Sequence, residues 1–400
     1  MRTMRSCLIL AACLPWCAHA QDAGKPSMFS TEWNVRLRHE AVDDAAFARD
    51  ADATTLRLRL GLRANFTDHW SALVEGEGIA AGGSYDSTAN GRRGYPVIAD
   101  AEGAELNQAL VAWKNDRLLA MVGRQRVQFG NQRWVGNSGW RQNEQTFDAL
   151  SFEGKFANDW SVHYAYLDRV HRVNGDKAID PLARERNLST HAFDLAWMPK
   201  SIQLRGYALL HDDQDVAAAS TATYGLRMTA NRLRDGHGPS LAAEYAHQSD
   251  WADNPLSFSH AYWLVEPAYA WGETSVRAGW EHLGGNGRHA LQTPLATLHP
   301  FNGWADKFAN ATPPGGLDDT YASVTTKAGC AKCEWIVAWH DYRADNSSGN
   351  VGGHYGSEWN ASFGFPIVEK LKGLMKVADY NADTFARDTT KLWFQLEWQH

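Results

Sequence analysis

Long apolar runs are missing from this chain of 400 residues: after the first 20 positions, no run of 18 or more apolar residues occurs. A helix that crosses a bilayer needs about 20 such residues, so we predict no transmembrane helix. An excess of basic residues is missing too. The formal net charge is −7 and becomes −9 once Arg2 and Arg5 are removed with the N-terminal segment. A mildly acidic chain gives no indication of a nucleic-acid partner.

Cysteine is scarce, and three of the five residues, Cys7, Cys13 and Cys17, lie in the first 20 positions. The remaining two, Cys330 and Cys333, have C-x-x-C spacing. No second pair completes a zinc site, and no helix follows as in a redox motif. In an oxidising compartment we expect a structural disulfide between them across a tight turn. Free thiols or a functional pair are the alternative.

Signatures of catalysis are also missing. The sequence has no Gly-rich phosphate loop between a strand and a helix, and its His, Asp and Glu residues lack metal-ligand spacing, so we predict no cofactor and no metal. A lipid hydrolase would need a Ser or Thr nucleophile beside a His. His191 and His247 share strand parity with apolar residues, but no Ser is suitably spaced. We predict no enzyme, with an outer-membrane hydrolase and an adhesion or structural barrel as alternatives.

The N-terminus has the features of a cleaved signal peptide. A basic start precedes the apolar run Cys7–Pro15, and the small-residue site Ala18-His19-Ala20 follows. We therefore divide the chain into a signal peptide, residues 1–20, and a mature part, residues 21–400. The mature protein is exported.

The stretch Thr54–Phe66 alternates strictly between apolar and polar residues. From position 56 on, the even positions hold leucines, an alanine and a phenylalanine, whereas Arg57, Arg59 and Arg63 occupy odd positions. Such alternation predicts a β-strand, because successive side chains point to opposite faces. A soluble strand with one dry face is one interpretation. A membrane-barrel strand, with leucines toward lipid and arginines toward a wet lumen, is the other.

The rest of the chain repeats this pattern about every 20 residues, which favours the barrel. Each alternating segment is near the length that a tilted strand needs to cross the hydrocarbon layer. We predict an all-β protein, a transmembrane antiparallel β-barrel of about 18 strands. These are expected at Phe29–Glu40, Thr54–Phe66, Trp70–Ile79, Glu105–Lys114, Leu118–Gln128, Thr146–Phe156, Trp160–Val170, Thr190–Met198, Ile202–His211, Thr223–Asn231, Ser240–Gln248, His260–Trp271, Thr274–Leu283, Thr320–Lys327, Cys333–Arg343, Tyr355–Pro366, Leu371–Asn381 and Thr389–Gln399.

The predicted connections alternate in length. Short turns such as Thr67–His69 and Asn115–Arg117 alternate with long connections such as Phe129–Gln145 and Gly284–Asp319. Short periplasmic turns and long outer loops are typical of outer-membrane barrels. The 18 tryptophans suit the aromatic belts of such a barrel, although sugar-binding proteins are also rich in Trp.

Strand parity predicts which side chains face the lumen. Charges on the lipid face would cost about 2–4 kcal/mol each near the midplane, so the parity that carries arginine is interior. Glutamates on the next strand would balance the arginines across strands. The lumen-facing residues so predicted are Arg36, Arg38, Arg57, Arg59, Arg63, Glu75, Glu77, Arg205, Arg227 and Arg277.

Three blocks of sequence carry a family resemblance. The first runs from Gly123 to Asp148 and includes Gly-Trp-Arg-Gln-Asn-Glu-Gln-Thr-Phe-Asp at its end. The second is Gln292–Leu298 with Phe301–Phe308, and the third is Ala378–Asp383 with Asp388–Trp393. In these blocks the chain resembles the alginate export family of outer-membrane porins.

The resemblance implies an 18-stranded barrel whose long loops fold over or into the pore, and an arginine-rich interior that passes a polyuronate. Carried over to this chain, it adds Arg124, Arg126, Arg133 and Arg141, with Asp148 as an acidic partner. The chain departs from alginate exporters in its shortness, in its ending at His400, and in the tight turn Ile367–Lys370, where exporters have a long plug loop.

Together these features predict an anion-favouring diffusion channel in the outer membrane of a Gram-negative bacterium. Arginine suits this role because it stays charged and its planar donors match carboxylates. The solute would be an acidic sugar, its polymer or a small anion. The other partners are outer-membrane lipid and the barrel assembly machinery, and we expect a monomer. An internal salt-bridge network that only fills the lumen is the alternative for each arginine.

Overall fold

The computed structural model describes residues 27–330, 332–347 and 353–399, and the predicted signal peptide lies outside these residues. The described residues form 18 strands in one sheet. The strands are β1 (Phe29–Asp44), β2 (Ala51–Asn65), β3 (Trp70–Ser84), β4 (Gly103–Lys114), β5 (Leu118–Gln125), β6 (Thr146–Ala157), β7 (Trp160–His171), β8 (Glu185–Trp197), β9 (Ile202–His211), β10 (Thr221–Asn231), β11 (His237–Asp250), β12 (Ser259–Trp271), β13 (Thr274–Leu283), β14 (Leu317–Thr326), β15 (Glu334–Arg343), β16 (His354–Val368), β17 (Leu371–Ala382) and β18 (Thr389–Gln399).

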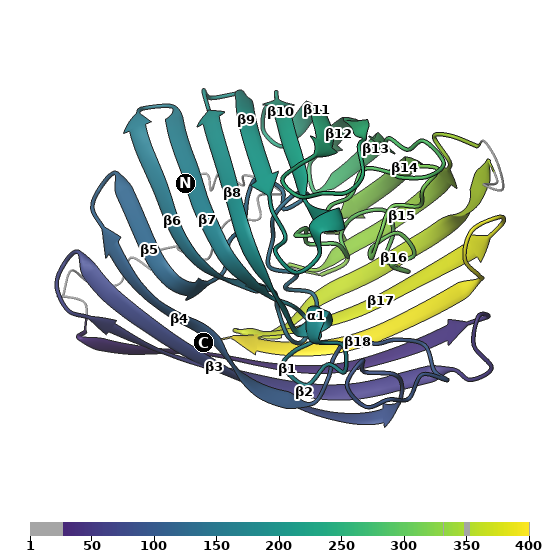
Figure 1. Ribbon diagram of the computed structural model, residues 1–400, viewed down its shortest axis with the longest axis horizontal. Coiled ribbons are helices and arrows are strands. Elements are labelled where there is room, and N and C mark those ends of the chain that lie inside the picture. Colours follow the sequence, from purple (N-terminus) through teal and green to yellow (C-terminus); the bar gives the residue numbers. More distant parts are fainter. Residues whose placement is uncertain (1–26, 331, 348–352, 400) are drawn as a thin grey trace.

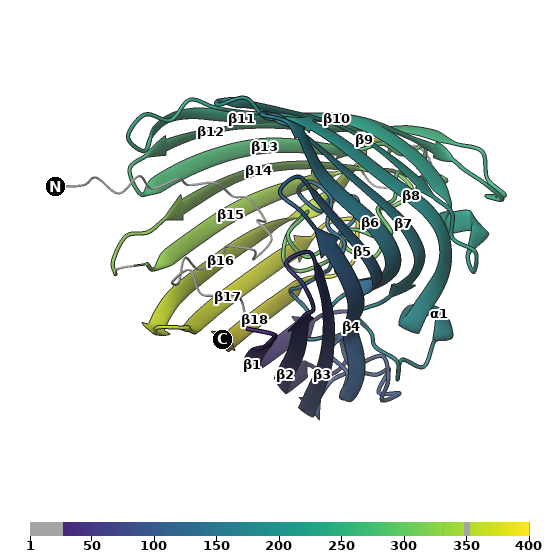
Figure 2. The ribbon, with the colours of Figure 1, turned by 90° about the vertical axis from the view of Figure 1, so that its left-hand side faces the viewer.

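The sheet closes on itself as a barrel. Every strand pairs antiparallel with its neighbours in the sequence, and β1 pairs with both β2 and β18. Figures 1 and 2 show the strands around one central space, with coil segments inside it. Closure leaves no open edge, so the backbone groups of each strand are paired within lipid. The predicted antiparallel barrel of about 18 strands is confirmed.

The two faces of the wall follow the predicted parity. On β2, Leu56 is 47% exposed on the outer face, whereas Arg57 is 1% exposed on the inner face. Large aromatic residues are exposed on the outer face near both ends of the strands, as expected for aromatic belts. They include Trp70, Trp160, Trp271 and Trp335 toward the short turns, and Tyr224, Tyr245, Trp263 and Trp359 toward the long connections.

Differences from the predicted elements are small and local. β5 ends at Gln125, three residues early, because the chain turns into the barrel there. β8 begins at Glu185, earlier than the predicted start at Thr190 and directly after a one-turn helix, α1 (Pro181–Arg184). The pairing of β3 with β4 shifts register between Glu75 and Gly76, and this irregularity explains why β4 does not alternate cleanly.

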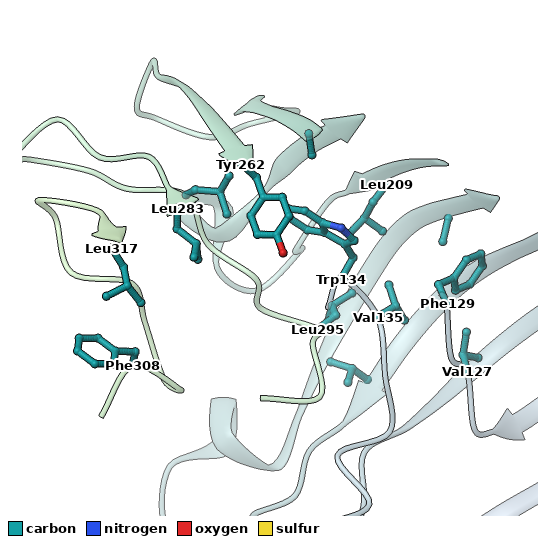
Figure 3. Packing of buried hydrophobic residues seen from close by; sticks show 14 of the residues in the cluster. Val127, Phe129, Trp134, Val135, Leu209, Tyr262, Leu283, Leu295, Phe308 and Leu317 are labelled. Carbon is teal, nitrogen blue, oxygen red and sulfur yellow. The ribbon is translucent and has the colours of Figure 1, made fainter. Parts of the chain in front are cut away.

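Two long connections enter the barrel. We call residues 126–145 inner loop 1 and residues 284–316 inner loop 2. They form a parallel bridge at Val135 and Leu295, and the amide of Gly136 donates to the carbonyl of Leu295 at 2.9 Å. Figure 3 shows Trp134, Val135 and Leu295 among apolar residues of the wall such as Leu209 and Tyr262.

The shorter connections also agree with the sequence. The turn between β16 and β17 is tight, as predicted for Ile367–Lys370. Cys330 and Cys333 form a disulfide between β14 and β15, with their Cα atoms 5.3 Å apart. Among the described residues, no helix has the length and apolar character needed to cross a membrane.

Candidate functional site

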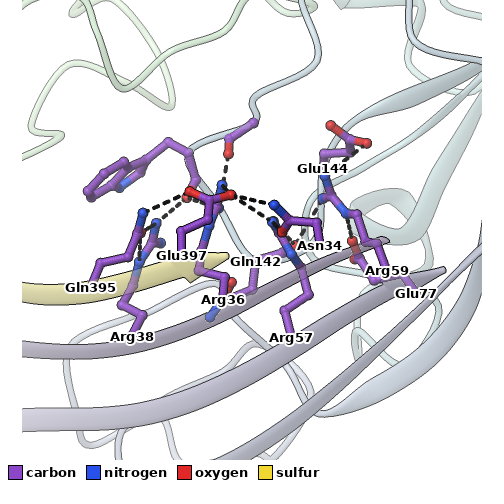
Figure 4. A network of polar contacts seen from close by, with 12 residues as sticks. Asn34, Arg36, Arg38, Arg57, Arg59, Glu77, Gln142, Glu144, Gln395 and Glu397 are labelled. Carbon is purple, nitrogen blue, oxygen red and sulfur yellow. Dashed lines mark hydrogen bonds and ion pairs between the residues drawn. The ribbon is translucent and has the colours of Figure 1, made fainter. Parts of the chain in front are cut away.

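Four arginines of β1 and β2 form a row on the inner wall, which we call the covered row: Arg36, Arg38, Arg57 and Arg59. They donate to backbone carbonyls of inner loop 1. Arg38 Nη2 donates to Trp140 O at 2.6 Å, and both Arg57 and Arg59 donate to Gln142 O at 3.1 Å. Arg36 Nη1 donates to Gly139 O at 3.1 Å. Figure 4 shows the row along the strands with Gln142 beside it.

Acidic side chains of the barrel wall and of inner loop 1 neutralise the covered row. Arg36 pairs with Glu397 at 3.0 Å, and Arg59 pairs with Glu77 of β3. Glu144 of inner loop 1 lies 3.2 Å from Arg59. All four arginines are buried. The row therefore fastens a loop to the wall, and its guanidinium groups are not open to the lumen.

Glu144 is the acidic anchor of inner loop 1. Its carboxylate contacts Arg59 and Arg126, and it accepts hydrogen bonds from Asn107 at 2.7 Å and from Asn137 at 2.7 Å. Burial alone would raise the pKa of this carboxyl, but Arg126 and Arg59 outweigh burial and hold the pKa at about 2. Glu144 is therefore ionised at neutral pH, and its charge stabilises the docked loop.

Asp306 anchors inner loop 2 in a similar way. It accepts from Lys391 at 2.9 Å, from Arg141 at 3.2 Å and from the Nδ1 of His299 at 2.7 Å. Burial lowers the pKa of the His299 ring to about 3, so this ring is neutral at neutral pH. Its Nε2 lies 2.6 Å from Nζ of Lys376. Asp306 joins both inner loops to β17 and β18.

Arg133 joins inner loop 1 to the opposite wall. Its Nε lies 2.9 Å from Glu281 of β13, and its Nη2 donates to the side chain of Asn302 at 2.9 Å. The guanidinium also stacks on Phe301 at 4.7 Å. Arg133 and Arg141, which the resemblance assigned to the pore, thus hold the two inner loops together, and Arg133 is buried.

A second set of arginines remains open to the lumen, and we call it the open set: Arg126, Arg205, Arg227 and Arg277. Arg205 and Arg227 lie directly opposite each other on β9 and β10. Each is paired with an acid of the adjoining strand, Arg205 with Asp194 and Arg227 with Glu244.

The same arginine pair lines a small pocket between inner loop 1 and strands β8–β11. Phe129, Trp134 and Tyr207 contribute aromatic surface to its lining. Glu244 accepts from Tyr207 and Trp134 as well, so its carboxylate is held back in the wall.

Two predicted pore residues do not face the lumen. Arg124 lies between Gly123 and the inward-facing Gln125, in register with Asp148 on β6. Asp148 in turn lies between the buried residues Phe147 and Ala149. Side chains directly across a sheet point to the same face, so Arg124 and Asp148 both point outward, which corrects the prediction. Their ion pair is 3.0 Å long.

The remaining predicted residues lie as expected. Glu75 and Glu77 are buried on the inner wall, where Glu75 pairs with Arg126 at 2.7 Å. Arg63 lies near the periplasmic end of β2 and pairs with Glu32 at 3.2 Å.

Sequence reasoning missed the groups that cover the arginines. Trp140 stacks on His299 with ring centroids 4.4 Å apart and receives the guanidinium of Arg38 at 4.1 Å. Lys376 lies 3.7 Å from the Trp304 ring and 4.3 Å from the Trp140 ring. The family blocks contain both tryptophans, so the signal was present, but it did not reveal which wall they contact.

One group of side chains has the composition of a cation site. His282, Asp318 and Asp345 bring possible ligand atoms within 4.8 Å of one another, among the residues that the structure describes. His282 Nδ1 lies 2.9 Å from Asp318, and Asp345 already accepts from the amide of Gly285 at 3.0 Å. These contacts account for the cluster without a metal ion.

Comparison with known proteins agrees with this architecture. Residues 28–298 match a family model described as Alginate export. That range includes the block from Gly123 to Asp148. The block Phe301–Phe308 and the C-terminal block lie beyond it. No curated protein matches the chain.

Solved structures share the fold. OpdO of Pseudomonas aeruginosa has a TM-score of 0.71 at 13% identity, over 93% of this chain and 97% of that one. OccAB4 of Acinetobacter baumannii has a TM-score of 0.72 at 11% identity, over 92% and 98%. OccK9 (OpdG) of Pseudomonas aeruginosa has a TM-score of 0.73 at 12% identity, over 93% and 98%.

Proposed function

The chain belongs to the Alginate export family of outer-membrane barrels, and on this premise we propose that it is a passive channel that favours anions, with acidic sugars and their short polymers as the preferred solutes. Family membership supports a channel rather than an enzyme. The carboxylate of a uronate would meet the open set of arginines on its way through the lumen. The mature domain, residues 21–400, would act as a single barrel.

One observation carries the anion preference: in each ion pair of the open set, the guanidinium is more exposed than the carboxylate. Side-chain exposure is 20% for Arg205 against 3% for Asp194, and 15% for Arg227 against 1% for Glu244. It is 34% for Arg277 against 18% for Glu266. Because the acid lies behind the arginine, a solute in the lumen meets positive charge first.

The pairing also limits how tightly a solute is held. A lone guanidinium in a narrow pore would bind a carboxylate strongly, with the planar two-point geometry that arginine favours. Asp194 and Glu244 compete for the same donors, so a passing carboxylate is attracted but released. A channel needs sites of this kind, favourable enough to enter and weak enough to leave.

The inner loops set the size of what can pass. Inner loop 1 is fixed by the covered row and inner loop 2 by Asp306, so both narrow the lumen permanently at neutral pH. A thin, extended or small solute fits this arrangement better than a folded polymer. Supporting evidence for an acidic saccharide is the description of the family as Alginate export.

The test is electrical. Reversal potentials of the purified barrel in planar bilayers, under a KCl gradient, give the anion-to-cation permeability ratio. We expect a ratio above one, and a lower ratio for Arg205→Gln/Arg227→Gln. A unit charge about 7 Å away in water contributes about 0.6 kcal/mol, so loss of two charges should lower the ratio at least about threefold.

A second measurement tests the solute class. Sodium glucuronate and short oligouronates should block the chloride current of the wild-type channel and block the double variant less. Neutral glucose at equal concentration is the control and should have no such difference. A cation-preferring wild type, or equal block by glucose and glucuronate, would refute the proposal.

A further inference from the structure

Charged residues gather on the outer face of β5–β8, where a barrel wall is expected to be apolar. We call these residues the outer cluster: Arg124, Asp148, Arg169, His171 and Glu185. Arg124, Asp148 and Arg169 occupy one row across β5, β6 and β7, and His171 and Glu185 face each other one step further along β7 and β8. The cluster uses four adjacent strands.

The contacts within the outer cluster form one chain. Arg124 Nε donates to Asp148 at 3.0 Å, and Arg169 Nη1 donates to Glu185 at 2.9 Å. His171 lies between the two acids, with Nε2 at 3.0 Å from Asp148 and Nδ1 at 3.3 Å from Glu185. Both ring nitrogens of His171 thus face carboxylate oxygens, and the two guanidinium groups lie at the two ends of this chain of contacts.

The depth of the outer cluster in the membrane can be inferred from its position near the ends of its strands. Arg124 is the last residue but one of β5, His171 is the last residue of β7, and Glu185 is the first residue of β8. All of these ends lead into long connections, the extracellular side of the barrel. A charge on the lipid face costs about 2–4 kcal/mol at the midplane but about 0–1 kcal/mol near the interface. The cluster therefore lies at the level of the outer headgroups.

The wall on the periplasmic side of the outer cluster carries both apolar and hydrogen-bonding side chains. Val122, Leu150 and Phe193 are exposed on the outer face and would contact acyl chains. His191 lies in the row of Val122 and Leu150, and Tyr164 lies opposite Phe193 one row further from the charges. The hydroxyl of Tyr164 lies 2.9 Å from His191 Nδ1, a pair that can bind sugar hydroxyls. Apolar and hydrogen-bonding groups thus share the two rows next to the outer cluster.

We propose that the outer face of β5–β8 binds a phosphorylated glycolipid of the outer leaflet, with the phosphate at Arg124 and Arg169. Each of these guanidinium groups uses only part of its five donors on protein oxygens, and both are partly exposed. Asp148 and Glu185 orient the two arginines on either side of His171. On the periplasmic side of the cluster, the Tyr164–His191 pair would bind sugar hydroxyls and the apolar residues beside it would contact the acyl chains.

Lipid A from purified lipopolysaccharide is the probe. The full barrel is reconstituted in nanodiscs, and lipid A that stays bound after detergent washing is measured by phosphorus content. We expect Arg124→Gln/Arg169→Gln to lower the affinity at least about tenfold, because each lost charge-assisted hydrogen bond contributes about 1.5–3 kcal/mol. Arg124→Lys/Arg169→Lys should retain part of the binding, since the charge remains.

Three controls make the outcome decisive. Arg343→Gln removes an exposed arginine paired with Asp341 at the extracellular end of β15, and it should bind lipid A like the wild type. Dephosphorylated lipid A should not be retained. EDTA should not strip lipid A, because guanidinium groups contact the phosphate without a bridging cation.

Folding of every variant is checked by the mobility shift of the unheated barrel on gels, and chloride conductance should equal that of the wild type. Equal retention by the folded Arg124→Gln/Arg169→Gln barrel, equal retention of the phosphate-free lipid, or complete stripping by EDTA would each overturn the proposal.

Discussion

The covered row and the open set contain the same residue type, on the same face of the same barrel, yet their surroundings differ. Arg57 donates to a loop carbonyl and is 1% exposed, whereas Arg277 keeps a third of its side chain open to the lumen. The difference lies in what covers them. The carbonyls of inner loop 1 accept from the arginines of β1 and β2, whereas Arg205, Arg227 and Arg277 pair with acids of the barrel wall.

This contrast separates two uses of a guanidinium. Five donors in a fixed plane can hold backbone carbonyls and a carboxylate together, which makes a buried arginine an efficient clamp. A partly exposed arginine backed by an acid instead presents a weak positive surface to a solute. Counting arginines in a lumen therefore overestimates the charge that a solute meets.

The largest effect should come from breaking the clamp. The sequence predicts that Arg57 and Arg59 face the lumen of an anion-favouring channel, but their contacts with Gln142 indicate that Arg57→Gln/Arg59→Gln would release inner loop 1. Removing one partner of a buried ion pair costs about 3–5 kcal/mol, which shifts the docked-to-undocked ratio at least about 100-fold. Single-channel conductance should rise and become noisy.

The open set provides the control for that experiment. Arg205→Gln/Arg227→Gln removes the same number of charges from the same lumen, and it should change the permeability ratio with little change in conductance. If the covered-row variant changed only the permeability ratio and left conductance constant, its arginines would be selectivity residues and the contrast drawn above would fail.

A smaller effect should appear on acidification, through Glu144. Its pKa in the docked loop is about 2, below the value of 4.5 for a free Glu. The ionised carboxylate therefore stabilises docking, fully above about pH 4.5 and progressively less as the pH falls toward 2. Conductance should be constant from pH 8 to pH 5 and should rise at lower pH.

Glu144→Gln tests the assignment, because the amide does not titrate in this range. The variant should already have raised conductance at neutral pH, and most of the change at low pH should vanish. Burial raises the pKa of Asp306, yet its partners His299 and Lys391 hold it well below the usual range, so any remaining change would report on this group. An unchanged acid response in Glu144→Gln would remove Glu144 from the loop anchor.

Much of the fold followed from the sequence because a barrel wall is a local pattern. Alternation fixes which side chains of β2 face in, and turn residues fix where strands end. The outward orientation of Arg124 could also have been predicted. Arg124 lies two residues after the outward-facing Val122, on a strand that ends at Gln125. Family likeness placed it in the pore instead, whereas Arg126, beyond the strand end, does turn inward.

Which arginines are covered could not be deduced from the pattern. The path of inner loop 1 is set by contacts between residues more than 80 positions apart, such as Arg57 with the carbonyl of Gln142. The alternating pattern places both Arg57 and Arg227 on the inner face of the barrel. Only the tertiary position of inner loop 1 distinguishes them.

The smallest effect on the permeability ratio is expected at Arg63. It tests whether the more exposed member of each ion pair decides which ions the lumen attracts. Here the order is reversed: Glu32 has 48% side-chain exposure and Arg63 has 16%, near the periplasmic end of β2. Exposed pairs contribute about 0–1 kcal/mol. Arg63→Gln should lower the anion-to-cation permeability ratio less than Arg205→Gln/Arg227→Gln does, and Glu32→Gln should raise it slightly. Equal effects of the two arginine variants would mean that total charge, rather than the order of exposure within each pair, sets what the lumen attracts.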